Sequence, residues 1–229
     1  MTAQGSSNRR STPGRRPGPS DSHSRERLLD EALKLFAERG IANTTLAQIA
    51  EAAEVTSAMV HYRFESRDKL LDAIVEERLA PQIREIWEPA DFARGSVLEV
   101  IQGIARRVLS IIDHAPWLPP LWLREIIQEG GMLRERVMQR IPDRKSMVFR
   151  NIVAEAQRSG EINPQLSPDL LFISLMALLM VPHAAATIRG RLSSSPPLDN
   201  ATIDRHVLSL LTHGLSPSEA GQPPKADVL

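Results

Sequence analysis

The sequence predicts an all-α protein in which a group of short N-terminal helices precedes a larger helical bundle. Apolar residues recur at three- and four-residue spacing along the chain, and no convincing run of β-branched residues alternates with a period of two. Apolar residues make up 42% of the chain but aromatic residues only 4%, so the core must be mostly aliphatic. A core rich in Leu and Ala favours helices over sheets.

Composition excludes several classes of protein. The 229 residues fit one large domain or two small ones, and 28 basic residues balance 28 acidic ones, which excludes a globally basic protein. The absence of cysteine excludes disulfide frameworks, thiolate zinc sites and cysteine nucleophiles. The six histidines show no metal-ligand spacing, so we expect neither a metal nor a cofactor.

Both ends of the chain are expected to be disordered, and no segment is long enough to span a membrane. Residues 1–23 form a Gly-, Pro- and Ser-rich arm with a net charge of +3, and residues 216–229 form a Pro-containing tail. The longest apolar run, residues 170–181, has 12 residues, whereas a spanning helix needs about 20. Since the N-terminus lacks a secretory signal, we expect a cytoplasmic protein.

Two helices are predicted between residues 24 and 53. The first has a candidate N-cap at Ser24 and a C-terminal stop at Gly40. The second follows Thr45, its expected N-cap, and has apolar residues at i, i+3, i+4 and i+7. The predicted inward-facing residues of the two helices are Leu29, Ala32, Leu33, Phe36, Leu46, Ile49, Ala50 and Ala53.

Two more short helices are predicted before Pro81, which ends or kinks the second of them. The first begins at Thr56 and buries Val60 and Phe64 on one face. The second begins near Ser66 and has an acidic residue in its first turn, where the helix dipole favours an anion.

The second half of the chain predicts longer and more apolar helices. Residues 97–111 carry a wide apolar stripe, so this helix is expected to run through the middle of a domain. Proline residues separate it from three further helices, around residues 121–128, 132–140 and 143–159. The motif Ser167-Pro168-Asp169 begins a helix that runs to about Ala186, and a last helix starts near Asn200.

The helix that begins at Thr56 has a composition suited to contact with DNA. Its positions outside the core, residues 56–59 and 61–63, hold hydrogen-bonding or small side chains where an exposed helix usually carries Glu and Lys. Small residues allow a helix to enter the major groove, hydroxyl groups and a ring nitrogen reach base edges, and Tyr and Arg reach phosphates. With the short helix before it, this segment predicts a helix-turn-helix.

Four segments, taken in order, carry a resemblance to a known family whose spacing matches from the first helix into the fourth, about 55 residues. They are Thr44-Thr45-Leu46-Ala47-Gln48-Ile49-Ala50, Ala53-Glu54-Val55-Thr56, Val60-His61-Tyr62-Arg63-Phe64 and Ser66-Arg67-Asp68-Lys69-Leu70-Leu71. Their sequence and spacing resemble the N-terminal domain of the tetracycline-repressor-like (TetR/AcrR) family. The resemblance implies an all-α homodimeric repressor whose second domain binds a small molecule and dimerises through its last two long helices.

Two residues depart from the pattern of this family. Glu54 stands in the turn where the family usually has Gly, and if that position requires a positive φ, Glu costs on the order of 1 kcal/mol. His61 stands where the family favours Tyr, and it offers a contact that depends on pH.

The predicted contacts with DNA fall into two groups. Ser57, His61 and Tyr62 are the side chains that we most expect to touch DNA, whereas threonine hydroxyls and Arg67 would position the protein on phosphates. The full predicted set is Thr44, Thr45, Thr56, Ser57, Ala58, His61, Tyr62, Arg63, Arg67 and Lys69.

The charge of the predicted DNA-binding segment is unfavourable. From Arg25 to Arg78 there are eight basic and eleven acidic residues, a net charge of −3. A DNA-binding domain with this net charge must have its basic residues clustered on one face, or another part of the chain must supply the positive charge. We therefore hypothesise that residues 9–16 of the basic arm contact DNA, in a minor groove; a solvated tail is the alternative.

The C-terminal region offers candidate ligand-binding residues, for each of which core packing is the alternative. Large aromatic, Met and polar side chains among aliphatic ones can line a cavity. The predicted set is Trp87, His114, Trp117, Trp122, Arg124, Phe149, Met176 and His183. Arg124 and Glu125 interrupt an apolar stretch. They form either a buried polar pair or the solvent-exposed face of a helix.

The last two long helices carry more apolar residues than one packed face requires. Some of these residues would build a four-helix interface between two chains, with intrachain core as the alternative. They are Phe172, Leu175, Leu179, Ile203, Val207, Leu210 and Leu211. A two-fold pair of helix-turn-helix units contacts two half-sites about 34 Å apart, which favours a homodimer.

These observations predict a ligand-responsive regulator: a repressor that binds palindromic double-stranded DNA as a homodimer and is released by an unidentified small-molecule effector. Its parts would be a basic arm (1–23), a DNA-binding domain (24–79), a ligand-binding and dimerisation domain (80–215) and a tail (216–229). Control by a protein partner is the alternative. Nothing supports a helical enzyme, since the chain has no Gly-rich phosphate loop, nucleophile elbow or His-Glu metal motif.

Overall fold

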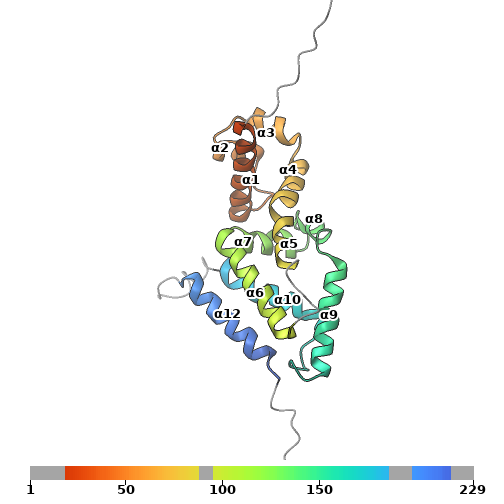
Figure 1. The fold of residues 1–229 in the computed structure, drawn as a ribbon. Helices are drawn as coiled ribbons and strands as arrows, with labels where there is room; N and C mark the ends of the chain where they lie inside the picture. The colour runs from red at the N-terminus through yellow and green to blue at the C-terminus, as the bar shows by residue number, and fades with distance from the viewer. Residues whose placement is uncertain (1–18, 88–94, 186–197, 218–229) are drawn as a thin grey trace, which may run out of the picture.

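The computed structural model describes residues 19–87, 95–185 and 198–217, which form helices and connecting turns without a β-strand. Figure 1 shows an N-terminal tier, α1 to α4, above a C-terminal tier, α6 to α12. The helices are α1 (Pro19–Arg39), α2 (Leu46–Ala52), α3 (Ser57–Phe64), α4 (Arg67–Ile74), the π-helix η1 (Val75–Leu79), α5 (Ala80–Trp87), α6 (Val97–His114), α7 (Leu118–Leu121), the π-helix η2 (Trp122–Ile127), α8 (Arg134–Met138), α9 (Asp143–Arg158), α10 (Pro168–Ala184) and α12 (Asn200–Leu215). The predicted all-α fold is confirmed. Residues 9–16 of the basic arm and most of the predicted tail lie outside the described residues.

Side-chain caps set where the short N-terminal helices begin. The hydroxyl groups of Thr45, Thr56 and Ser66 each accept the backbone N–H three residues further on. The predicted N-cap at Thr45 and the predicted helix starts at Thr56 and Ser66 are therefore confirmed. The prediction for the first helix is wrong, because α1 already includes Pro19 and Ser24 therefore lies inside it. Proline suits the first turn of a helix, where its missing N–H would have no partner.

α4, η1 and α5 form one helical run that connects the two tiers (Figure 1). Pro81 does not end this run. It cannot donate an N–H to the carbonyl four residues earlier, and the wider π turn directly before it pairs the Ala80 N–H with the carbonyl oxygen of Val75. The boundary that the sequence suggests after Leu79 therefore falls inside a continuous helical run.

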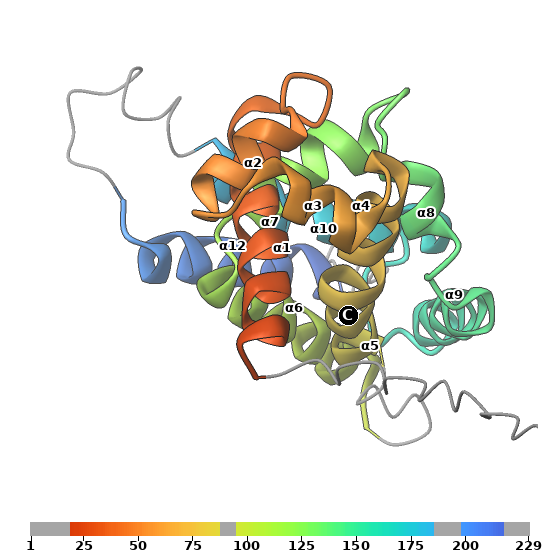
Figure 2. The same ribbon diagram turned by 90° about the horizontal axis from the view of Figure 1, so that it is seen from above.

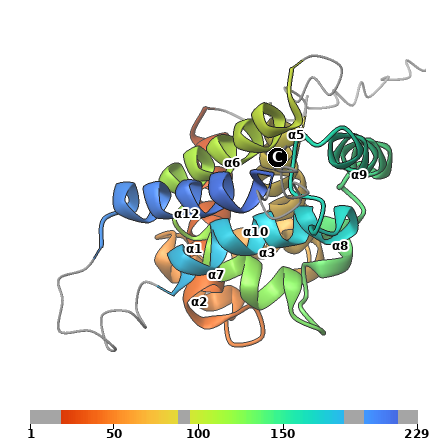
Figure 3. The same cartoon turned by 90° about the horizontal axis from the view of Figure 1, so that it is seen from below.

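α10 occupies the centre of the C-terminal tier. It contacts α6, α7, η2, α9 and α12, and Figure 3 shows α12 lying between α6 and α10. α10 begins at Pro168 as predicted, although the Ser167 side chain makes no capping bond, and it ends at Ala184. Because α10 has neighbours on several sides, a sequence that is apolar all round suits it. No helix among the described residues is long and apolar enough to cross a bilayer.

Candidate functional site

α3 presents an exposed face without a carboxylate on the outer side of the N-terminal tier, where Figure 2 shows it beside α2 and α4. Val60 is fully buried and Phe64 is 3% exposed, so these two side chains fix the helix against the core. Tyr62, by contrast, is 80% exposed. The exposed positions are Ser57, Ala58, Met59, His61 and Tyr62. Small and hydrogen-bonding side chains of this kind allow close approach to the edges of bases.

Arg25 of α1 fixes the C-terminal end of α3. Its guanidinium lies 4.7 Å from the centroid of the Phe64 ring and forms an ion pair with Glu77 at 2.6 Å. Its Nη1 also donates to the backbone carbonyl of Arg63 at 3.5 Å. The half-buried guanidinium of Arg63 lies 5.9 Å from the centroid of the Tyr62 ring. These contacts hold the most exposed ring of α3 next to a defined cation.

The turn between α2 and α3 places Glu54 at a positive φ, the strained conformation that the sequence comparison had suggested. Glu54 has a φ of 55°, in the region that favours glycine. Its carboxylate pairs with Arg27 of α1 at 3.0 Å, but the Glu54 side chain is 80% exposed. An ion pair this exposed contributes little, so the turn keeps a cost of about 1 kcal/mol.

Two residues predicted to contact phosphate have side chains that are engaged within the protein. Thr44 is 1% exposed and its hydroxyl donates to the carbonyl oxygen of Gly40 at 2.8 Å. The prediction for Thr44 is therefore wrong, because a buried hydroxyl cannot reach DNA. The Arg67 guanidinium donates to the carbonyl oxygen of Ile41. The exposed members of the predicted phosphate-contacting set are Thr45 and Thr56, and Lys69, which was predicted to contact DNA, is exposed as well.

Acidic residues neutralise half of the basic residues between Arg25 and Arg78. Four of the eight form ion pairs with carboxylates of the same segment: Arg25, Arg27, Lys34 and Arg78. A glutamate one turn away raises the pKa of Lys34, through a hydrogen bond first and its charge second. These four paired residues therefore cannot supply the excess positive charge that DNA favours.

Glu125 of η2 links the C-terminal tier to the loop after α1. This side chain is 6% exposed, its Oε1 accepts the Ile41 N–H at 2.8 Å, and its Oε2 accepts the Met132 N–H at 3.2 Å. Gly40 permits this approach: it has a φ of +83°, and a Cβ there would lie 3.1 Å from the Arg124 side chain. Arg124 is exposed, so the two residues do not form a buried polar pair.

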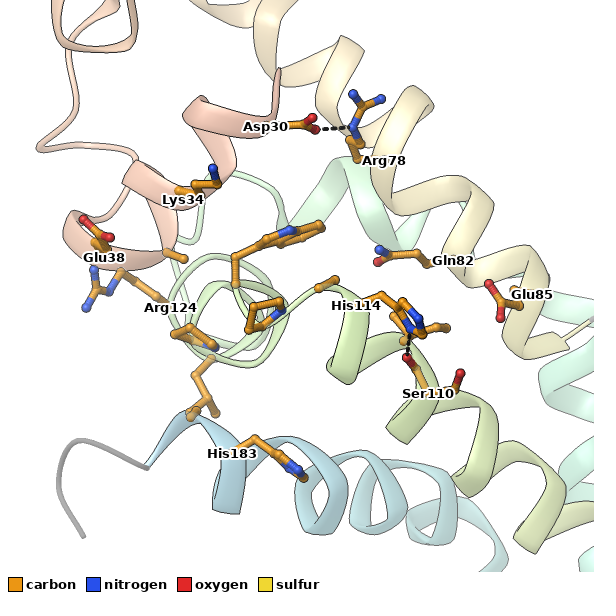
Figure 4. Close-up of a pocket in the computed structure, with 18 of the residues that line it drawn as sticks. Asp30, Lys34, Glu38, Arg78, Gln82, Glu85, Ser110, His114, Arg124 and His183 are labelled. Carbon is orange, nitrogen blue, oxygen red and sulfur yellow. Dashed lines mark hydrogen bonds and ion pairs between the residues drawn. The ribbon is translucent and has the colours of Figure 1, made fainter. Parts of the chain in front are cut away.

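An open cleft of about 1450 Å³ lies between the two tiers, with α1, η1 and α5 on one side and α6, η2 and α10 on the other (Figure 4). Four predicted ligand-binding residues line it: His114, Trp117, Arg124 and His183. The ring of His183 already has partners, because Nδ1 lies 2.8 Å from the Leu179 carbonyl oxygen and Nε2 lies 3.1 Å from Asp204 Oδ1. Burial raises the pKa of Asp204, and the nearby His183 partly opposes that rise.

A separate apolar pocket of about 90 Å³ lies within the C-terminal tier. Three predicted ligand-binding residues, Trp87, Trp122 and Met176, line it. Phe149 lines neither hollow: it is 2% exposed and packs edge-on against Trp87, with ring centroids 6.3 Å apart. Gln82 of α5 belongs to the walls of both the pocket and the cleft.

Most residues predicted for a dimer interface form the core of a single chain. Leu175, Leu179, Ile203, Val207 and Leu211 are at most 6% exposed, and Phe172 stacks on the Trp87 ring with centroids 4.8 Å apart. For these residues the alternative, intrachain core, holds, because their side chains are already buried within one chain. Leu210 is 48% exposed. A further row of exposed apolar side chains on α10 was not predicted: Leu170, Ile173 and Val181.

A helix-turn-helix with an exposed third helix, joined through one helical run to a larger helical bundle, defines a DNA-binding transcriptional regulator. The model for bacterial regulatory proteins of the tetR family matches residues 28–74, which extend from α1 to the end of α4. Residues 28–74 therefore match the DNA-binding domain of the TetR family of transcriptional regulators.

Similar proteins match most of the chain at low sequence identity. The HTH-type transcriptional repressor DhaR of Mycobacterium sp. (strain GP1) is 24% identical over 153 residues, which cover 67% of this chain and 77% of DhaR. The structure of the ketosteroid transcriptional regulator KstR2 of Mycobacterium tuberculosis has a TM-score of 0.63 and 20% identity, over 85% of this chain and 95% of that one. The structure of AibR in complex with isovaleryl coenzyme A and operator DNA has a TM-score of 0.62 and 16% identity, over 82% and 97%. At these identities the two structures show a shared fold.

Proposed function

We propose that this regulator is a cytoplasmic repressor that binds a palindromic operator as a homodimer through α3 and is released by a small-molecule effector. The exposed face of α3 carries this proposal, because it combines an 80% exposed Tyr62 with small and polar neighbours while Val60 and Phe64 hold the helix in place. A relative named as a repressor and a solved neighbour bound to operator DNA add support.

The contact with DNA is tested with Tyr62, the only tyrosine of the chain. The operator is first selected from fragments of the genome of the source organism. Tyr62→Ala should then weaken operator binding by about 1–3 kcal/mol, a typical value for a specific base contact, while the melting temperature stays unchanged. Met147→Ala on α9, in the other tier, is the control that should bind normally. Unchanged operator affinity of Tyr62→Ala contradicts the proposed role of α3.

The exposed apolar row of α10 and α12 supports dimerisation. Leu170, Ile173 and Val181 of α10 and Leu210 of α12 are 43% to 58% exposed, and the two helices are packed side by side. A second copy of the chain is the expected occupant, since a two-fold pair of α3 helices would contact two half-sites about one helical turn apart.

Self-association is tested by placing a charge in this row. Ile173→Asp should sediment as a monomer and lose affinity for a two-site operator, because an aspartate in an apolar interface would be buried without a partner. Met147→Asp makes a comparable change at a position on α9 that is 64% exposed, and it should remain a dimer. A wild-type protein that sediments as a monomer at operator-binding concentrations contradicts this part of the proposal.

The position of the cleft supports control by a small molecule. A molecule bound there would contact α1 of the N-terminal tier and α6, η2 and α10 of the other tier. It would release DNA if it binds the conformation without DNA better, by a few kcal/mol. An acyl thioester is a reasonable first candidate, since the AibR structure contains isovaleryl coenzyme A. Titration of the protein–operator complex with small molecules tests this, and release only by a second protein contradicts it.

A further inference from the structure

The apolar pocket within the C-terminal tier has walls that favour an uncharged occupant. Aliphatic, Met and aromatic side chains line it, and none of the described residues in its wall is ionisable. A charge buried there would have no partner, which is far more costly than apolar contacts can offset. Any group that enters the pocket should therefore be uncharged.

The volume of the pocket limits the size of that group. The pocket measures about 90 Å³, whereas an apolar cavity that holds benzene has roughly 150 Å³. By that ratio it fits a hydrocarbon group of about four carbon atoms. Met176 and Met180 belong to the wall, and methionine adapts its shape to its neighbours, so straight and branched groups of this size can fit.

Gln82, which Figure 4 shows among the residues of the cleft, also belongs to the wall of the apolar pocket, so it places one hydrogen-bonding group where the two meet. Its Oε1 is buried and has no hydrogen-bond partner in the described part of the chain. A buried carbonyl without a partner is unfavourable, so an occupant that pairs with it gains affinity. Rotation of the amide by 180° presents Nε2–H instead, so both hydroxyl and carbonyl groups can pair with this side chain.

The cleft on the other side of Gln82 suits a larger polar body. Charged side chains of both signs line it, among them Lys34, Glu38, Arg78 and Arg124. Its volume of about 1450 Å³ exceeds that of the apolar pocket by more than tenfold. The apolar pocket and the polar cleft thus meet at Gln82. This arrangement matches a molecule with a short apolar end and a bulky polar part.

We propose that the effector is an amphiphile with a short acyl group. About four carbon atoms lie in the apolar pocket, the carbonyl or hydroxyl group next to them pairs with Gln82, and the polar body lies in the cleft. This inference rests on the proposed function, since it names the chemical class of the effector at the site already described.

The tryptophans of the chain report binding directly. Trp87 and Trp122 line the pocket and Trp117 lines the cleft, and these are the only three tryptophans. The probes are butyryl, isovaleryl and palmitoyl coenzyme A, with coenzyme A alone as the control for the polar body. We expect the two short thioesters to change the fluorescence and to bind at least tenfold more tightly than the other two. Tighter binding of the palmitoyl thioester, or binding of no thioester, overturns the proposal.

Two substitutions test the individual contacts. Gln82→Leu replaces the amide by an apolar group of similar size and so removes the hydrogen bond; it should weaken binding of isovaleryl coenzyme A about tenfold. Gln102→Leu on α6 is the control and should not weaken binding, because Gln102 lines neither the pocket nor the cleft. Met176→Phe fills the pocket and should abolish the preference for short chains, whereas Met147→Phe on the exposed side of α9 should preserve it. Wild-type affinity and chain-length preference in both pocket variants overturn the assignment.

Operator binding separates this inference from the function it rests on. A protein that binds its operator but is released only by molecules of another class keeps the proposed function and overturns the short-acyl assignment. A protein that binds no DNA overturns the proposed function, and the fluorescence titrations still decide what the pocket takes.

Discussion

At the scale of single residues, Glu54 provides a direct test of backbone strain. With its φ of 55°, Glu54→Gly should raise the free energy of unfolding by about 1 kcal/mol, because glycine adopts this conformation without a clash. The lost ion pair with Arg27 is too exposed to cancel that gain. Denaturant titration measures the change. Glu51→Gly, inside α2, should instead lower stability by about 1 kcal/mol, and a destabilised Glu54→Gly would contradict the assignment of strain.

Asp199, the N-cap of α12, gives the fold a dependence on pH. Hydrogen bonds from the Thr202 side chain and backbone lower the pKa of Asp199 below its usual value. Because the pKa is lower in the folded state, the stabilisation is fully present above the unfolded value of about 3.9 and is lost as the pH falls through the folded value. Thermal denaturation at decreasing pH should show this loss in the wild type and less of it in Asp199→Asn, which keeps a capping side chain. An unchanged acid profile would argue against it.

At the scale of elements, the two faces of α10 should respond differently to truncation. Leu175 is fully buried and Ile173 is 55% exposed. Leu175→Ala should lower the free energy of unfolding by about 2–5 kcal/mol because it leaves a cavity. Ile173→Ala should change it by no more than about 0.5 kcal/mol at concentrations where the chain is monomeric, but it should weaken self-association. Denaturation and sedimentation of both variants check this, and equal losses of stability would contradict the packing of α10.

Periodicity and capping residues predicted most of the helical segments, but not the start of α1 at Pro19 or the helix α5 after Pro81. Local signals such as Thr45 and Thr56 act within one turn of helix, so they can be recognised in the sequence. The faces of α10 were not predictable in the same way, because Leu175 and Ile173 are both apolar and only the neighbouring helices distinguish them. Thr44 was misassigned because a threonine hydroxyl can be satisfied by a backbone carbonyl one turn earlier.

The residues that line the cavities also show that local sequence patterns cannot predict contacts between distant parts of the chain. Trp87, Trp122 and Met176, which were predicted to bind a ligand, line the apolar pocket. Gln82 was missed, although a signal exists: it lies three residues after Leu79 and four before Ile86, on the apolar face of the helix. The contact between Glu125 and Ile41 joins residues 84 positions apart, and no local pattern reveals such a pair.

At the scale of the whole molecule, Glu125 couples the two tiers. Glu125→Ala would leave the buried N–H of Ile41 and the N–H of Met132 without an acceptor, and a buried orphan costs about 1–3 kcal/mol. We expect lower stability and weaker operator binding, because the loop that leads into α2 loses its anchor. Glu129→Ala, which removes an exposed glutamate that lines neither hollow, is the control. Fluorescence anisotropy with labelled operator measures the affinity, and wild-type affinity in Glu125→Ala would show that the loop needs no anchor.

The π turn of η1 has a consequence for how such a regulator can diverge. Each residue of a helix adds a rotation of about 100°, so the insertion or loss of one residue between Ile74 and Ala80 would turn α5 by that angle relative to α4. Gln82 and Trp87 would leave their walls, while α3 would keep its place and its DNA sequence preference. A single codon gained or lost in this stretch could thus change the chemical signal that an ancestral regulator detects while its target genes stay the same.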